Sequence, residues 1–487
     1  MGKMKWHIVW GVGITVVFLI LLIVRLEIFQ EKPTAIEPDR QVDISRPPVS
    51  WMNIYQDRKK IGFIRRTFHK LDNGRIQTEE NVTLQINTMG VSQMLNIATE
   101  TELNADMTFS SFHFLLHSSL FRFQAKGYVE KDKLIVYAGV PSALEKTVLP
   151  VKNIPHISGN IYEAAFRGRL GINQKRIFSI FDPSTLGMRE ISVTRHPDEV
   201  ILIMGKRILT QKFCADFMGA KNCAWLAKDG ETLKESGMLG MTLEKVSAKT
   251  AQEGLSQGGS ADFTEIASIP SNVQIDDPSA ISSLVVKLEG LQELPLGIFG
   301  GRQKYSRGIL TITRESASER TSQEPDASLQ KYLQPSLLVQ ANAPEIKKQA
   351  QAIVASADAS HVKIKKIVTW VHKSIEKKPS LSVPNALEVL KNKTGDCNEH
   401  AVLTAALLRA AGIPAQIETG LVYMKGRFYY HAWNTAYDGR WITVDTVLNQ
   451  IPADVTHIRL TRGDGGEQLD LLGVMGKLKL EVLSTTK

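Results

Sequence analysis

Cysteine is scarce in this chain of 487 residues, which contains only Cys214, Cys223 and Cys397. So few cysteines exclude a disulfide-built scaffold and argue against a zinc ribbon. The first two lie close together in FCADFMGAKNC, and in an oxidising compartment they would close a short loop with a disulfide. Two free buried thiols are the alternative. If the first two cysteines pair, Cys397 is left as a free thiol.

A dense block of Lys and Arg is also missing, although the formal net charge is +9. Dispersed basic residues are typical of a solvated surface, and attraction to an anionic surface such as phospholipid is the alternative. No motif for nucleic-acid binding occurs, so we expect no nucleic-acid partner. The hydrophobic fraction of 43% and the charged fraction of 22% are those of an ordinary globular protein. The length predicts about three units.

Charged residues are absent from Trp6 to Val24, which read WHIVWGVGITVVFLILLIV. A helix of this length just spans a hydrocarbon core of about 30 Å. Two lysines precede it, so we expect a cytoplasmic tail at residues 1–5 and a single-pass anchor in the cell membrane at residues 6–26. A cleaved signal peptide is the alternative, although no small-x-small cleavage site follows. In either case the bulk of the protein is periplasmic or otherwise extracytoplasmic.

The segments that follow differ in composition. Residues 27–48 contain four prolines, which predicts an extended linker. From residue 49 to residue 247, apolar and polar residues alternate in segments such as KIGFIRRTFHK and KLIVYAG, with short turns between them. This pattern predicts an antiparallel β domain, and it resembles the curved sheets of bacterial envelope proteins related to lipoprotein carriers. Residues 248–330 combine a polar linker with a second β-rich segment.

Helical spacing begins in the last part of the chain, residues 331–487. There the run AVLTAALLRAA is apolar nearly all round, which indicates a helix buried in the centre of a domain, and Gly412 ends it. Cys397 falls in the first turn of this helix. Unpaired N–H groups and the positive end of the helix dipole favour a thiolate at that position. A small buried apolar cysteine is the alternative.

Two strands follow, FYYHAWNTAY and RWITVDT, joined by an Asp-Gly pair. A two-residue turn would put His431 and Asp445 on opposite faces of the hairpin. A three-residue loop ending at Gly439 would instead pair Ala436 with Arg440 and set His431 directly opposite Asp445. Local propensity mildly prefers the first turn, but a catalytic pair requires the second, because a slip of one residue reverses the face of every side chain. We therefore predict the three-residue loop.

With this register the three residues suit a thiol enzyme. Cys397 would attack a carbonyl carbon, His431 would take the thiol proton and later protonate the leaving group, and Asp445 would orient the imidazole. The backbone N–H of Cys397 is a candidate donor to the oxyanion.

The motifs GDCNEHAVLTAALLRAAGIPA, HAWNTAY and WITVDT resemble the bacterial transglutaminase-like superfamily, relatives of papain-like thiol enzymes. Cys397, His431 and Asp445 occupy the positions of its catalytic triad. The resemblance implies a papain-like α+β domain, no cofactor, no metal ion, and a protein or peptide amide as substrate. Two positions depart from the usual pattern: Thr446 stands where proline is frequent, and Thr435 where an acidic residue is frequent.

Other residues near these motifs have more than one interpretation. Trp433, Trp441 and Asn398 are candidates for a substrate cleft, and core packing is the alternative for the tryptophans. Cys397 and His400 have a spacing that zinc ligands use, but no complementary pair of ligands is evident, so we expect His400 to be a polar residue of the helix start. His457, in DVTHIRL, either supports the triad, lies at the surface or packs in the core.

The sequence thus predicts an α+β protein with an N-terminal transmembrane helix, an antiparallel β-rich envelope domain and a C-terminal transglutaminase-like domain. The favoured function is a membrane-anchored thiol enzyme that transfers or hydrolyses protein or peptide amides through an acyl-enzyme. The alternative is an inactive envelope scaffold whose β domain captures a partner. The superfamily includes cross-linking enzymes, proteases, amidases and inactive members, so the resemblance does not name the reaction.

Overall fold

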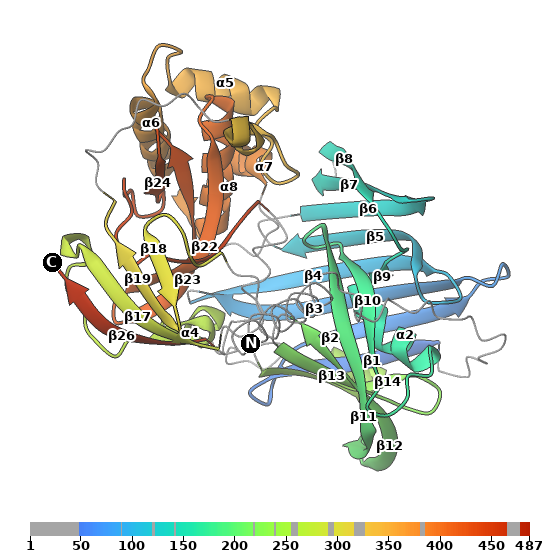
Figure 1. Ribbon diagram of the computed structural model, residues 1–487. Coiled ribbons are helices and arrows are strands. Elements are labelled where there is room, and N and C mark those ends of the chain that lie inside the picture. The colour runs from blue at the N-terminus through green and yellow to red at the C-terminus, as the bar shows by residue number, and fades with distance from the viewer. Residues whose placement is uncertain are drawn as a thin grey trace, which may run out of the picture.

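The structure is a computed structural model that describes residues 48–88, 90–118, 122–140, 143–217, 220–237, 240–254, 262–290, 297–315, 327–379, 385–464 and 478–487. Within these ranges the chain is a strand-rich α+β protein, with a large sheet on one side and a mixed helix-and-strand unit on the other (Figure 1). No helix of the described ranges is long and apolar enough to cross a membrane. The anchor expected at residues 6–26 lies outside these ranges, as do the expected tail and almost all of the proline-containing linker.

The large sheet has fifteen strands, and sequence neighbours pair side by side through most of it, in the order β8-β7-β6-β5-β4-β3-β2-β1-β15-β14-β13-β12-β11-β10-β9. All of its pairs are antiparallel except that of β9 with β10. Alternating apolar residues and short turns produce this meander. The strands are β1 Val49–Gln56, β2 Lys59–Lys70, β3 Ile76–Thr88, β4 Val91–Leu103, β5 Phe109–Ser118, β6 Arg122–Glu130, β7 Lys133–Val140, β8 Ala143–Pro150, β9 His156–Ile157, β10 Lys175–Asp182, β11 Gly187–Ile203, β12 Lys206–Phe217, β13 Ala220–Leu226, β14 Thr232–Ser236 and β15 Met241–Val246.

Aromatic side chains fill the core of this sheet. Phe109, Phe112 and Phe181 form a buried group whose ring centroids lie 5.2 to 6.0 Å apart. The short helix α2, Ile161–Arg167, buries its two central alanines in the same core. Edge-to-face and tilted aromatic packing of this kind stabilises a sheet beyond the area it buries.

Cys214 and Cys223 form a disulfide between β12 and β13, where they are directly paired residues of the antiparallel ladder. Both half-cystines are buried, and Trp225 packs beside them. The bridge therefore joins two adjacent strands of a hairpin.

The second β-rich segment pairs with the end of the chain. Strands β17 Ser283–Glu289, β18 Gln303–Ser306 and β19 Ile309–Thr313 form a four-stranded sheet in the order β18-β19-β17-β26, and β26 is Lys479–Thr486. Strand β16, Ile269–Pro270, pairs with β23. A domain boundary at residue 330 would therefore separate strands that pair in two sheets. Strand β16 pairs with β23, and β17 pairs with β26, across that boundary.

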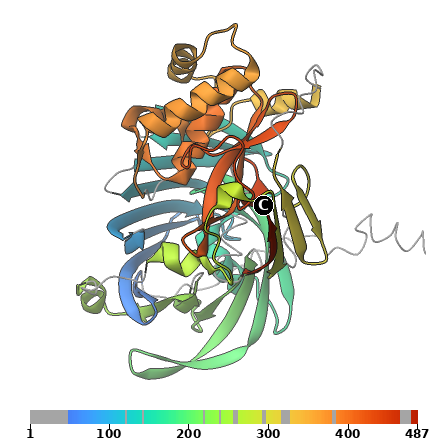
Figure 2. The same ribbon diagram turned by 90° about the vertical axis from the view of Figure 1, so that its left-hand side faces the viewer.

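The C-terminal unit packs helices against a second sheet, in the order β16-β23-β22-β25 with β24 also on β23. Its strands are β22 Ala415–Met424, β23 Arg427–Tyr437, β24 Trp441–Val444 and β25 Ile458–Arg462, and its main helices are α5 Pro344–Ile353, α6 Ser360–Ser374, α7 Ala386–Asn392 and α8 Cys397–Ala410. Helix α8 is buried nearly all round, as its apolar sequence predicts. It packs on β23, where the Asn434 Nδ2 donates to the Ala401 carbonyl oxygen at 2.9 Å. Figure 2 shows these helices as one layer above the strands.

Shorter elements complete the described chain. They are η1 Ser158–Asn160, α3 Ala248–Gln252, α4 Phe263–Ala267, η3 Pro278–Ala280, η4 Ala327–Leu333, β20 Glu376–Lys377 and β21 Thr394–Gly395. The β20–β21 pair is parallel, and its second strand, β21, lies directly before α8 in the chain. It therefore fixes the backbone that leads to Cys397.

Removal of the Cys214–Cys223 bridge tests its contribution to stability. We expect the double variant Cys214→Ala/Cys223→Ala to lower the free energy of unfolding by about 2–3 kcal/mol, because a closed loop of this length restricts the unfolded chain by that amount. Urea denaturation measures the difference, and a reducing agent should destabilise the wild type but leave the double variant unchanged. Mass spectrometry of protein isolated from its native cells without a reducing agent would contradict the bridge if both cysteines are recovered as alkylated thiols.

Candidate active site

A capping box fixes the start of α8. The Asp396 carboxylate accepts from the Asn398 N–H at 2.9 Å, and the Glu399 carboxylate accepts from the Asp396 N–H at 2.8 Å. Gly395 is required before them, because a Cβ there would lie 2.3 Å from the Cβ of Glu399. Cys397 is the first residue of the helix, so this network determines where its thiol points.

The surroundings of the thiol favour its neutral form. Burial raises the pKa of Cys397 well above its ordinary value, and the negative charges of Asp396, Glu399 and Asp445 raise it further, against the opposing effect of a backbone hydrogen bond with Ala432. Burial and these carboxylates therefore oppose the effect of the helix dipole, on which the expectation of a thiolate rests.

His431 and Asp445 meet in the interior. The Nε2 of His431 lies 2.7 Å from the Oδ2 of Asp445, and both side chains are buried. The Oδ1 of Asp445 accepts from the backbone N–H groups of Val447 and Leu448 at 2.7 and 2.9 Å. Burial by itself would raise the pKa of Asp445, but the charge and hydrogen bond of His431, and those of His457, hold it well below its usual value. Asp445 is therefore a carboxylate.

The hairpin register differs from the predicted one by two residues. Tyr437 pairs with Trp441 across a three-residue loop, with Gly439 at a φ of 74° in its centre. The predicted glycine conformation is present, but the loop lies one residue later in the chain. A shift of two residues preserves the face of each side chain, so His431 and Asp445 remain on one face as diagonal neighbours.

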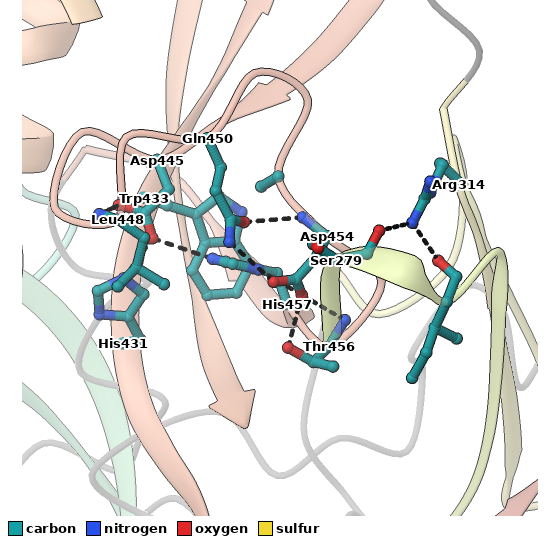
Figure 3. A network of polar contacts seen from close by, with 12 residues as sticks. Ser279, Arg314, His431, Trp433, Asp445, Leu448, Gln450, Asp454, Thr456 and His457 are labelled. Atoms are coloured by element: carbon teal, nitrogen blue, oxygen red, sulfur yellow. Dashed lines mark hydrogen bonds and ion pairs between the residues drawn. The ribbon is translucent and has the colours of Figure 1, made fainter. Parts of the chain in front are cut away.

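His457 joins the pair and was not assigned to it from sequence. Its Nε2 lies 2.9 Å from the Oδ2 of Asp445, the same atom that His431 contacts, and its Nδ1 lies 3.3 Å from the Oδ1 of Asp454 (Figure 3). Since both ring nitrogens face carboxylates, both are donors and the ring is an imidazolium. Burial would lower the pKa of His457, but its hydrogen bonds to the two carboxylates raise it above its usual value. The local signal in the sequence for a charged His457 is the spacing Asp454-x-x-His457, which places a carboxylate beside its ring.

Trp433 forms the floor of the site. Its indole is 1% exposed and lies between two imidazoles, stacked on His431 at 6.0 Å and edge-on to His457 at 5.2 Å. Its Nε1 donates to the Glu418 carboxylate at 2.9 Å, which Arg459 also contacts at 3.1 Å. Of the two interpretations of Trp433, core packing is the one that its burial favours, since residues 431–436 of β23 are all buried and the strand is covered on both faces.

The remaining candidates lie at different places. Trp441 packs edge-on against Tyr332 and Tyr437, with ring centroids 5.1 and 5.5 Å away. Asn398 is partly buried and follows Cys397 in the first turn of α8. His400 is fully buried, with its Nδ1 2.7 Å from the Asp396 carbonyl oxygen, and burial lowers its pKa. Trp441 and Asn398 are thus only partly buried, whereas His400 is fully enclosed.

One group of three potential metal ligands occurs in the described part of the chain, formed by His431, Asp445 and His457. Two ligands of one tetrahedral zinc ion would lie about 3.3 Å apart, since each bond is about 2.0–2.1 Å. The Asp445 Oδ2 is only 2.7 and 2.9 Å from the two imidazole nitrogens, which are hydrogen-bond lengths. The three residues fit a hydrogen-bonded chain and not a shared metal ion.

Comparison with known proteins agrees with this geometry. Residues 347–446 match the family model of the transglutaminase-like superfamily. No curated protein is similar enough in sequence to be matched.

Several solved structures are similar to parts of the chain. A candidate cysteine protease from Cytophaga hutchinsonii is 18% identical with a TM-score of 0.27, over 45% of this chain and 84% of that one. A β-barrel-like protein of a domain of unknown function from Brucella abortus is 11% identical with a TM-score of 0.32, over 41% and 95%. The periplasmic domain of TgpA from Pseudomonas aeruginosa, bound to ethylmercury, is 14% identical with a TM-score of 0.22, over 39% and 86%.

The matched residues include Cys397, His431 and Asp445 and end one residue after Asp445. Residues 347–446 are a domain of the transglutaminase-like superfamily.

Proposed function

We propose that this protein is an envelope thiol enzyme that acts on protein or peptide amides through an acyl-enzyme on Cys397. An N-terminal helix holds it in the cell membrane, with the bulk of the chain outside the cytoplasm. The observation that carries the proposal is the 2.7 Å contact between His431 and Asp445. Ala432, the residue that follows His431 on β23, has a backbone hydrogen bond with Cys397. A nucleophile, a base and an orienting carboxylate thus come from three segments that meet at one place.

The mechanism starts from a neutral thiol. As the Cys397 sulfur attacks the amide carbon, its proton passes to His431, and Asp445 supports the imidazolium that forms. The tetrahedral oxyanion takes hydrogen bonds from backbone donors at the start of α8, such as the Cys397 N–H. When the intermediate collapses, the C–N bond breaks, His431 returns the proton to the leaving amine, and a thioester remains. An amine or water then attacks the thioester, its proton passes through His431 to the sulfur, and the free thiol is restored.

An inactive scaffold is the second candidate, and the raised pKa of Cys397 favours it. A thiol surrounded by carboxylates is a poor nucleophile unless a base removes its proton during attack. The large β sheet would then capture a partner. Selective alkylation of Cys397 by an iodoacetamide probe separates the two functions, since a vestigial thiol would show no reactivity that depends on His431.

Replacement of the three residues should have graded effects on acyl-enzyme formation. Cys397→Ala should abolish it, and His431→Ala should reduce it nearly as much, because residues that act as one unit are not additive. Asp445→Asn should reduce it somewhat less, by at least about 10³-fold, through loss of the imidazole tautomer. Intact-mass spectrometry with peptide amide substrates in purified envelopes measures the thioester. The matched control is His69→Ala, which replaces an exposed histidine. Equal amounts of thioester in His431→Ala and the wild type would contradict the assigned roles.

Asp396→Asn tests the charge that surrounds the thiol. Asparagine caps a helix as well as aspartate does, so the start of α8 should remain intact. Because a negative charge is lost, the pKa of Cys397 should fall, and the alkylation rate should reach half of its maximum at a lower pH than in the wild type. Asp132→Asn, in an exposed turn of the β sheet, should leave the profile unchanged. An identical profile in Asp396→Asn and wild type would show that Asp396 does not control the thiol.

His457→Gln tests the buried cation. The variant leaves Asp445 and Asp454 without the positive charge between them, so the free energy of unfolding should fall by about 3–5 kcal/mol. The alkylation profile of Cys397 should also move to higher pH, because the charge of Asp445 is then less compensated. Urea denaturation and iodoacetamide kinetics give the two readouts, with His69→Gln as control. Unchanged stability would mean that His457 is neutral in the folded protein.

A further inference from the structure

The hairpin of β11 and β12 ends in exposed apolar side chains. Val200, Leu202, Met204 and Leu209, here called the apolar tip, are 49%, 69%, 58% and 54% exposed. In the ladder Val200 lies opposite Leu209, and Leu202 lies opposite Arg207, so these side chains share one face. Isolated exposed apolar residues are ordinary, but a group gathered on one projecting element marks an interaction surface.

The charges around the apolar tip have one sign. From Val200 to Gln211 the sequence is VILIMGKRILTQ, in which Lys206 and Arg207 are the charged residues. Both are exposed. The acidic residues nearest the tip are paired: Asp198 contacts Arg195 and Glu199 contacts Lys212, each at 2.9 Å. Apolar side chains beside exposed cations complement the interface of a bilayer that contains anionic lipid.

The apolar tip projects from the end of the sheet where the described chain begins. Strand β12 runs away from the tip, and each following neighbour in the sheet reverses direction, from β13 through β14 and β15 to β1. Strand β1 therefore starts at the end of the sheet from which the hairpin extends. Figures 1 and 2 show this hairpin reaching beyond the rest of the sheet. Residues 27–47, between the expected anchor and the described chain, would span up to about 75 Å when extended, so the tip can reach the same membrane.

We propose that the apolar tip inserts into the interfacial region of the membrane that holds the N-terminal anchor, with Lys206 and Arg207 on anionic headgroups. The inference rests on the proposed anchoring and gives the protein a second point of attachment, which fixes its orientation. The Cys214–Cys223 bridge joins β12 to β13 three residues beyond this segment, and it holds the base of the hairpin in the sheet. A protein partner is a weaker fit, because the tip lacks the tryptophan and tyrosine anchors that dominate protein interfaces.

Site-directed fluorescence of the full chain tests this insertion. An environment-sensitive label is attached at Leu202→Cys, or at the control position Lys59→Cys at the opposite end of the sheet, in a Cys397→Ala background. The protein is reconstituted into vesicles of phosphatidylcholine and phosphatidylglycerol, and flotation reports anchoring separately. Lipids with brominated acyl chains should quench the label at position 202 at least about twofold more than the label at position 59, because only the former lies among the acyl chains.

Replacement of the two basic residues provides a second test of the insertion. Lys206→Glu/Arg207→Glu should abolish at least about half of that extra quenching, because the tip is then repelled by anionic headgroups. Equal quenching at positions 202 and 59 in vesicles that carry the protein would overturn the insertion while leaving the anchor in place. If the protein does not float with the vesicles, the anchoring fails and the insertion fails with it, whereas the thiol chemistry is unaffected.

Discussion

The site depends on one buried carboxylate, that of Asp445. Its two oxygens accept four hydrogen bonds, two from backbone N–H groups of the following turn and two from the imidazoles of His431 and His457. A buried charge is tolerated only when it is paired and fully hydrogen-bonded, so these four donors must all be held in position. They come from β23, from the turn after β24 and from the segment before β25. The carboxylate therefore fixes three parts of the C-terminal unit relative to one another.

A second buried carboxylate, that of Glu418, supports the site through Trp433. Glu418 binds the Trp433 indole and two arginines, Arg459 and Arg462, whose positive charges lower its pKa against the effect of burial. The indole in turn packs against both histidines. The site is consequently rigid on its inner side, which suits a base that must keep one orientation through two proton transfers. Because burial and the nearby carboxylates raise the pKa of Cys397, we propose that its attack is coupled to proton transfer to His431.

The sequence predicted those features that depend on local pattern. The apolar run after Cys397 placed the cysteine at the start of a buried helix, whereas His431 and Asp445 were set on one face by the three-residue loop, which was chosen because a catalytic pair requires it. The hairpin register was missed by two residues, because an Asp-Gly pair fits more than one loop and Gly439 is left-handed in several of them. The contact of His457 with Asp445 and the pairing of β17 with β26 are tertiary, and no local spacing encodes them. The influences that raise the pKa of Cys397 are likewise tertiary, because the helix dipole is a local property whereas burial and the surrounding carboxylates are not.

The protonation of His457 tests this account most directly, because a neutral ring could not satisfy both Asp445 and Asp454. Nitrogen NMR of the histidine-labelled full chain in detergent measures it, with the His457 signals assigned by their loss in His457→Gln. The structure predicts that both ring nitrogens of His457 carry protons at neutral pH and that the pattern persists above the ordinary histidine pKa of about 6.5. A neutral pattern, with one protonated and one bare nitrogen, would contradict the charged His457–Asp445–His431 arrangement on which the proposed chemistry depends.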